Sequence, residues 1–275
     1  MIKSINSWSF QDSNDLKGNV ELAAKAGFEA IELALNPDKG PLTWSSTEAE
    51  VKGVRRVVED AGLKVASLAI GTGWQYPLSS PDPKIAQQGV DSIRKGLDVA
   101  HWLGTDGVLV VPGTTTPEVS YDVVYERSKE KLAGLVNHAK QAQVAICVEN
   151  VWNKFHLSPL EMRGYVDSFH SPWVAVYFDV GNIILYGYPE QWIRILGARI
   201  KKVHFKDFRA SAGNFTGFVG LLEGDVNWPE VMKAFKEVGY EGPASVEIGA
   251  YKYHWKASIH VISLQMDFIF GRRDG

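Results

Sequence analysis

The feature that most constrains this chain is a regular alternation of short apolar runs with longer helix-like segments, from one end to the other. Such strand–helix repeats build a parallel sheet, because parallel neighbours must be joined by a crossover of a dozen or more residues. We predict eight strands, at 2–5, 30–35, 65–70, 108–111, 144–148, 174–178, 200–203 and 244–246.

Helices are predicted at 14–26, 47–61, 86–103, 121–141, 159–169, 189–196, 228–238 and 255–270. A chain of 275 residues suits a barrel of eight such units, which typically needs about 250. We therefore predict an α/β fold in which residues 1–275 form a single (β/α)8 TIM-barrel domain. A doubly wound open sheet is the alternative, but no Gly-x-Gly-x-x-Gly follows the first strand.

Composition narrows the classes of molecule that this protein is expected to bind. The net charge of −3 gives no general attraction to nucleic acid or to an anionic membrane. No apolar run approaches the roughly 20 residues of a membrane helix, and the first residues do not resemble a signal peptide. The single cysteine, Cys147, has no partner for an internal disulfide, which favours a reducing compartment. We expect a cytoplasmic protein that binds a small molecule.

Four residues end predicted strands and carry chemistry: Glu149, Asp179, His204 and Glu247. In a barrel the carboxyl ends of all strands meet at one mouth, so these side chains are expected to converge. Three carboxylates and one imidazole favour a hard or borderline ion such as Mn²⁺, Mg²⁺ or Co²⁺, with Zn²⁺ as a further candidate. Of these we expect Mn²⁺.

A family resemblance is carried by motifs at these strand ends. The motifs are Val148-Glu149-Asn150, Phe178-Asp179-Val180-Gly181-Asn182, Val203-His204-Phe205-Lys206-Asp207, Glu223-Gly224-Asp225-Val226-Asn227-Trp228 and Val246-Glu247. They resemble the sugar-phosphate isomerase/epimerase family of the xylose-isomerase-like barrel superfamily, which includes hexulose-6-phosphate isomerases and 3-epimerases and ketose 3-epimerases. The resemblance implies that the four residues bind one divalent cation and that Glu149 and Glu247 are also catalytic.

The implied reaction passes a proton through a cis-enediolate, with one glutamate removing it and the other returning a proton. Return to the opposite face gives epimerisation, and return to the adjacent carbon gives isomerisation; the sequence leaves both open, together with phosphorylation of the carbohydrate substrate. A homodimer or homotetramer is the state that relatives often adopt. An inosose-type dehydratase and a non-catalytic sugar-binding barrel are the alternatives. An endonuclease IV-like nuclease is disfavoured by the absence of a basic excess.

Further substrate contacts are expected around the mouth. The candidates are Lys206, Asn182, Arg209, Trp152, His156, Trp8, Trp74 and Glu32. Lys206 lies two positions after His204 and so on the same side of its strand, where neutralising the carboxylates is an equal alternative. Asn182 stands where the ketose 3-epimerases often carry a histidine. The alternatives are an exposed loop position for His156 and either an exposed position or a salt bridge for Glu32.

Overall fold

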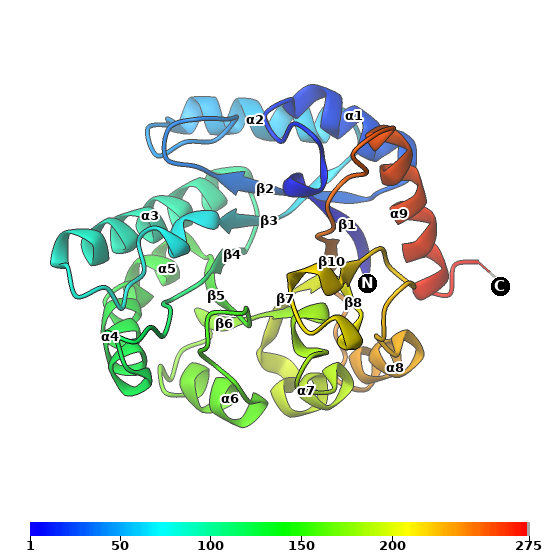
Figure 1. Cartoon of the computed structure of the whole chain (residues 1–275). Helices are drawn as coiled ribbons and strands as arrows, with labels where there is room; N and C mark the ends of the chain where they lie inside the picture. The colour runs from blue at the N-terminus through cyan, green and yellow to red at the C-terminus, as the bar shows by residue number, and fades with distance from the viewer. Residues whose placement is uncertain (274–275) are drawn as a thin grey trace.

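In the computed structural model, which describes residues 1–273, eight parallel strands form a closed barrel with helices around it (Figure 1). Around the barrel the order is β1-β10-β7-β6-β5-β4-β3-β2, because β8 and β9 form a separate hairpin. The barrel strands are β1 (Ile2–Asn6), β2 (Ala30–Leu35), β3 (Lys64–Ile70), β4 (Gly107–Val110), β5 (Ala145–Glu149), β6 (Val174–Asp179), β7 (Ile200–Phe205) and β10 (Pro243–Val246). The predicted fold class is confirmed.

The helices fill the crossovers. They are α1 (Leu16–Ala26), α2 (Glu48–Asp60), α3 (Pro83–Leu103), α4 (Tyr121–Ala133), α5 (Val136–Ala142), α6 (Pro159–Asp167), α7 (Pro189–Leu196), α8 (Trp228–Glu237) and α9 (Trp255–Ile269). The prediction of a single helix over 121–141 is wrong, because the helix is interrupted between α4 and α5. Gly134 has a low helix propensity, and the break lets Leu135 become fully buried.

Capping residues explain where several helices begin and end. Thr47 and Glu50 form a reciprocal capping box at the start of α2. Asp82 caps α3 and Pro83 opens it, which places that start three residues before the predicted one. Gly27 and Gly104 end α1 and α3 with φ of 88° and 76°, a left-handed conformation that glycine adopts without steric cost.

Strand alternation divides the core into two layers. On β5, Ile146 and Val148 belong to the large apolar cluster that joins the barrel to its helices, whereas Ala145 and Cys147 face the barrel interior. The interior apolar cluster consists of Ala69, Leu109, Val111, Ala145, Cys147, Val151, Ala175 and Tyr177. Glu149, two residues beyond Cys147, therefore points to the inner side, at the carboxyl end of the barrel.

A buried ammonium group lies toward the opposite end of the barrel. Lys202 Nζ donates to the carbonyl oxygen of Ala66 at 2.7 Å and to Asp106 Oδ1 at 2.6 Å. Although partial burial opposes it, the charges of Lys202 and Lys201 lower the pKa of Asp106 to about 2. This ion pair therefore stays charged at neutral pH.

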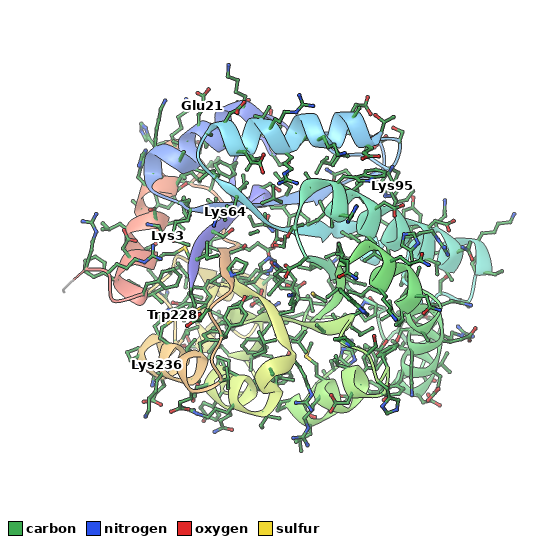
Figure 2. All side chains as sticks on the ribbon, turned by 180° about the vertical axis from the view of Figure 1, so that it is seen from behind. Lys3, Glu21, Lys64, Lys95, Trp228 and Lys236 are labelled. Carbon is green, nitrogen blue, oxygen red and sulfur yellow. The ribbon has the colours of Figure 1, made fainter. Side chains whose placement is uncertain are left out.

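The outer helices carry much of the exposed charge. Glu21 on α1 and Lys236 on α8, for example, lie at the outside of the molecule when it is seen from behind (Figure 2). Within residues 1–273, none of the helices combines the length and the apolar character needed to cross a membrane.

A small antiparallel hairpin after β7 was not predicted. It consists of β8 (Asp207–Phe208) and β9 (Phe218–Val219) and lies over the carboxyl end of the barrel (Figure 1). The Asp207 carboxylate organises it by accepting hydrogen bonds from the backbone of Leu222 and Val226 and from Trp228 Nε1. These bonds tie the hairpin to the start of α8.

The interior position of Cys147 makes a prediction. Burial raises the pKa of its thiol to about 12, and the side chain is fully buried, so the reactive thiolate is scarce and inaccessible. We expect a chromogenic disulfide reagent to label no thiol in the native protein and one per chain in guanidinium, with Cys147→Ala silent in both. Rapid stoichiometric labelling of the native protein would contradict the buried assignment.

Candidate metal centre

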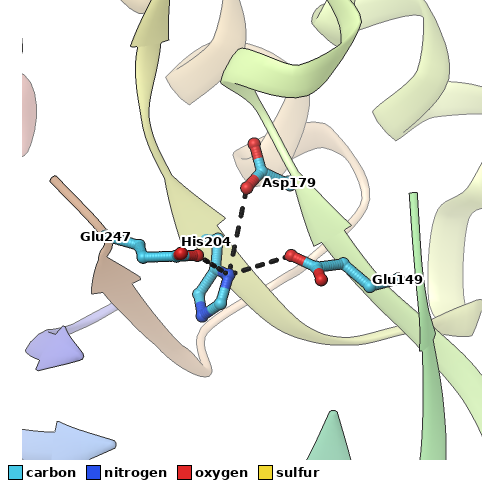
Figure 3. Close-up of side chains that lie close together, drawn as sticks. All are labelled: Glu149, Asp179, His204 and Glu247. Atoms are coloured by element: carbon cyan, nitrogen blue, oxygen red, sulfur yellow. Dashed lines mark hydrogen bonds and ion pairs between the residues drawn. The ribbon is translucent and has the colours of Figure 1, made fainter. Parts of the chain in front are cut away.

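The four strand-end residues meet at one point. Glu149 and Asp179 are the last residues of β5 and β6, His204 lies near the end of β7, and Glu247 follows β10 directly. These four strands are consecutive neighbours in the barrel. One ligand atom from each residue lies within 4.8 Å of every other, and Figure 3 shows the side chains pointing toward one another.

A single nitrogen is the centre of this cluster. His204 Nδ1 lies 3.0 Å from Glu149 Oε1, 2.9 Å from Glu247 Oε2 and 3.9 Å from Asp179 Oδ2 (Figure 3). Only Glu247 keeps appreciable exposure. Carboxylates in such a buried setting need compensating positive charge.

The pKa shifts of the four residues reflect this crowding. Burial raises the pKa of Glu149 and of Asp179, although His204 and Lys206 oppose the shift. For Glu247 burial acts in the same sense, but Lys206 and His204 outweigh it and lower its pKa. Burial alone would lower the pKa of His204, yet the surrounding carboxylates raise it well above its ordinary value. Bound protons and Lys206 thus supply the compensating charge when no metal is bound.

Asp179 provides the test of whether a metal fits. Its Oδ1 accepts a hydrogen bond from the backbone N–H of Asn182 at 2.9 Å, and its backbone is held by the side chain of Asn150. Its Oδ2 is buried and accepts no hydrogen bond; Lys206 Nζ lies 3.0 Å away without hydrogen-bond geometry. An oriented, unsatisfied carboxylate oxygen beside two further carboxylates and an imidazole is a donor set that suits a divalent cation.

Lys206 lies at the site, on the predicted side of β7. Its ammonium group is 3.0 Å from Asp179 Oδ2 and 2.9 Å from Glu247 Oε2. Burial disfavours its charge, but Asp179, Glu247 and Glu149 outweigh that and raise the pKa of Lys206. Both alternatives expected for it are compatible with this position, since it neutralises the carboxylates and also faces the cavity.

The cavity above the cluster has a volume of about 150 Å³, and five aromatic side chains form part of its wall. Trp8, Trp74, Trp152 and Asn182 line it, as expected from their loops. The Asn182 side-chain amide, however, donates to the carbonyl oxygen of Asn150 at 2.9 Å, so that nitrogen is occupied within the protein.

Two aromatic residues of the wall were not predicted. Phe215 and Phe218 come from the β8–β9 hairpin and pack against Trp152, with ring centroids 4.9 Å and 5.2 Å from its ring. The hairpin strands have two residues each, which is too short for apolar alternation to indicate them. The acidic motif at Glu223–Trp228 was the one available signal, because its backbone and Trp228 bind Asp207.

Three residues predicted to contact the substrate do not line this cavity. Arg209 is exposed and donates to the carbonyl oxygen of Glu223 at 3.0 Å, because the hairpin turns its side chain toward that loop. His156 is buried against Phe155 and Tyr165, so it is neither a cavity residue nor an exposed loop residue. Glu32 does not line the cavity but is fully buried inside the barrel, 3.0 Å from His204 Nε2.

Comparison with known proteins finds one matching family model and relatives of similar length. The model of the family described as "Xylose isomerase-like TIM barrel" matches residues 20–265. The L-ribulose-5-phosphate 3-epimerase UlaE of Escherichia coli O1:K1 is 28% identical over 241 residues, which cover 83% of this chain and 80% of that protein.

Solved structures share the fold. A D-psicose 3-epimerase from Clostridium cellulolyticum H10, determined with D-tagatose, superimposes with a TM-score of 0.79 at 18% identity, covering 98% of this chain and 99% of that one. An L-ribulose 3-epimerase gives a TM-score of 0.75 at 19% identity, covering 98% and 93%.

Metal binding is testable without a substrate. We expect chelator-treated protein to bind one Mn²⁺ per chain and to gain about 2.7 kcal/mol of unfolding free energy at a free metal concentration ~100 times the dissociation constant. Asp179→Asn should weaken Mn²⁺ binding by more than roughly 10–100-fold, the loss typical of removing a residue that only hydrogen-bonds to a metal ligand. Calorimetric titration and thermal unfolding measure both. Asp106→Asn, at the other end of the barrel, is the control; equal binding by Asp179→Asn and the parent would contradict the site.

Proposed function

The chain belongs to the xylose isomerase-like TIM barrel family, and we propose that it is a divalent-metal-dependent ketose 3-epimerase. The observation that carries this proposal is the placement of Glu149 and Glu247. They come from β5 and β10, with β6 and β7 between them, and both line the cavity while facing the same His204 nitrogen. Two glutamates on either side of a bound sugar are what epimerisation requires.

Each residue has a role in this proposal. Glu149, Asp179, His204 and Glu247 would hold the cation, which when bound supplies Lewis-acid polarisation of the ketose carbonyl and acidifies the neighbouring C–H. One glutamate takes the proton from C-3, and the other delivers a proton to the opposite face. Proton exchange of both carboxyl groups with solvent then restores their starting states. Lys206, beside Asp179 and Glu247, is placed to stabilise negative charge that develops on substrate oxygens.

Return of the proton to the opposite face, rather than to the adjacent carbon, is favoured for two reasons. Glu149 and Glu247 flank the cluster from separate strands instead of lying side by side. The similar proteins named above are also 3-epimerases. Isomerisation would need the same group, or one beside it, to serve both carbons on one face.

The cavity favours an unphosphorylated ketose. Among residues 1–273, Lys206 is the one cationic side chain in its lining, and it is already paired with Asp179 and Glu247. With a divalent ion bound, the charges of the carboxylates and Lys206 cancel, so a phosphate dianion would enter a partly desolvated site without a counter-charge. The aromatic wall instead suits the C–H face of a neutral sugar and excludes water from a reactive enediolate.

The acid–base assignment is tested by isotope exchange. We expect the parent protein with Mn²⁺ to incorporate solvent deuterium at C-3 of a ketose, and Glu149→Gln and Glu247→Gln each to lose about 10²–10⁴-fold in rate, because a positioned acid or base contributes that much. Proton NMR follows the exchange, and Glu237→Gln on α8 is the control. Near-parent rates in either cavity variant would refute the roles. Loss of water from the product would indicate a dehydratase, and sugar binding without exchange a binding protein.

The substrate class is tested with matched pairs. We expect kcat/KM for L-ribulose, D-psicose or D-tagatose to exceed that for the corresponding phosphate by at least about 10-fold, which is 1.4 kcal/mol. The same deuterium exchange assay serves both members of each pair. A preference for L-ribulose 5-phosphate would overturn the substrate class and leave the epimerase intact, whereas no exchange on any ketose or phosphate would overturn the epimerase.

A further inference from the structure

A buried hydrogen-bond network lies inside the barrel, on the far side of His204 from the three carboxylates. Its centre is Glu32 on β2, which is fully buried. Glu32 Oε1 accepts from Asn6 Nδ2 at 2.6 Å and lies 3.0 Å from His204 Nε2. Glu32 Oε2 accepts from Ser67 Oγ at 2.5 Å and from the Tyr177 hydroxyl. One carboxylate is thus connected to side chains of four other strands.

The strands are built to bring these groups together. In register, Glu32 is opposite Asn6 on β1 and Ser67 on β3. The β2–β3 pairing shifts between Ile31 and Glu32, and the β6–β7 pairing shifts just before Tyr177. Such irregularities re-aim side chains and are common beside active sites. Both shifts fall at members of the network.

Packing alone does not account for Glu32. The other side of the interior is apolar, with Ala69, Leu109 and Cys147 among its members. A buried carboxylate in that setting is costly unless its oxygens are fully hydrogen-bonded. Glu32 achieves this with four donors, one of which is His204. The network therefore places a carboxylate against Nε2 of His204, the second nitrogen of the proposed ligand.

The hydrogen-bond pattern fixes the state of His204 when a cation is bound. A carboxylate only accepts hydrogen bonds, so the hydrogen of a neutral imidazole facing Glu32 must be on Nε2. The lone pair is then on Nδ1, which points at the three carboxylates, while Nε2 points away from them (Figure 3). The Tyr177 ring, with its centroid 4.5 Å from that of His204, restricts rotation of the imidazole.

We propose that Glu32 is a positioning residue that holds His204 with Nε2–H donated to its carboxylate and Nδ1 free to ligate a divalent cation. Asn6, Ser67 and Tyr177 in turn hold Glu32 in place. The inference rests on the proposed metal site. It assigns to Glu32 an indirect role, through His204, in place of substrate contact.

The experiment measures Mn²⁺ affinity of chelator-treated protein by calorimetry. We expect Glu32→Ala to weaken binding about 10–100-fold, the usual effect of losing a carboxylate behind a histidine ligand. Glu32→Gln, which still offers a carbonyl oxygen to Nε2–H, should lie between Glu32→Ala and the parent. Ser67→Ala should give a smaller loss. Ser4→Ala is the matched control, because it also deletes a buried interior hydroxyl, one that bonds Ser245 outside the network.

A second readout separates positioning from general stability. In protein loaded with Zn²⁺, which is diamagnetic, nitrogen-15 NMR of the His204 ring should show a slowly exchanging hydrogen on Nε2 in the parent and in Ser4→Ala. That signal should shift in Glu32→Gln and be lost to exchange in Glu32→Ala. If Glu32→Ala does not fold, Glu32→Gln and Ser67→Ala against Ser4→Ala provide the same comparison.

The outcomes distinguish the two proposals. Folded Glu32 variants that bind Mn²⁺ like the parent, or that leave the Nε2–H signal unchanged, would overturn the positioning role and leave the metal site intact. A parent protein that binds no divalent cation would overturn the metal site and the positioning role together. If Ser4→Ala weakens Mn²⁺ binding as much as Ser67→Ala does, the loss comes from a less stable interior. That result would also overturn the inference.

Discussion

The site depends on holding Glu149, Asp179 and Glu247 around one imidazole nitrogen, an arrangement that their mutual repulsion opposes. The closed parallel barrel gives the four adjacent strand ends a fixed spacing that side-chain motion cannot relax. The unfavourable electrostatics is concentrated at that point, where Lys206 and His204 offset part of it. A rigid scaffold that keeps unsatisfied ligands close together is also what makes a metal site bind strongly.

The convergence of the four candidate ligands could be predicted because each ends an apolar run, and strand periodicity indicates which side of the strand a residue faces. Depth along the barrel is not written in that periodicity. Glu32 and Glu149 both face inward, but Glu32 lies within the interior and Glu149 at the mouth. The difference follows from the place of each residue in its strand, because Glu32 is the third residue of β2 and Glu149 is the last residue of β5.

Loops were less predictable for a related reason. Arg209 and His156 each follow a strand end, yet one turns to the backbone of Glu223 and the other packs beneath Phe155 and Tyr165. Their directions are set by tertiary contacts. Arg209 follows the hairpin that the Asp207 carboxylate ties to the start of α8, and His156 packs against Tyr165. The break at Gly134 is similar, since burial of Leu135 overrides a helical pattern that continues through it.

The position of the cavity has a consequence for how ligands enter and leave it. The cavity lies at the carboxyl end of the barrel, with the packed apolar interior beneath it. Under the proposed function, a sugar and its epimer, which differ by the orientation of a single hydroxyl, would enter and leave on this side. The two sugars would then compete for one cavity, and accumulating product would slow further conversion of its precursor.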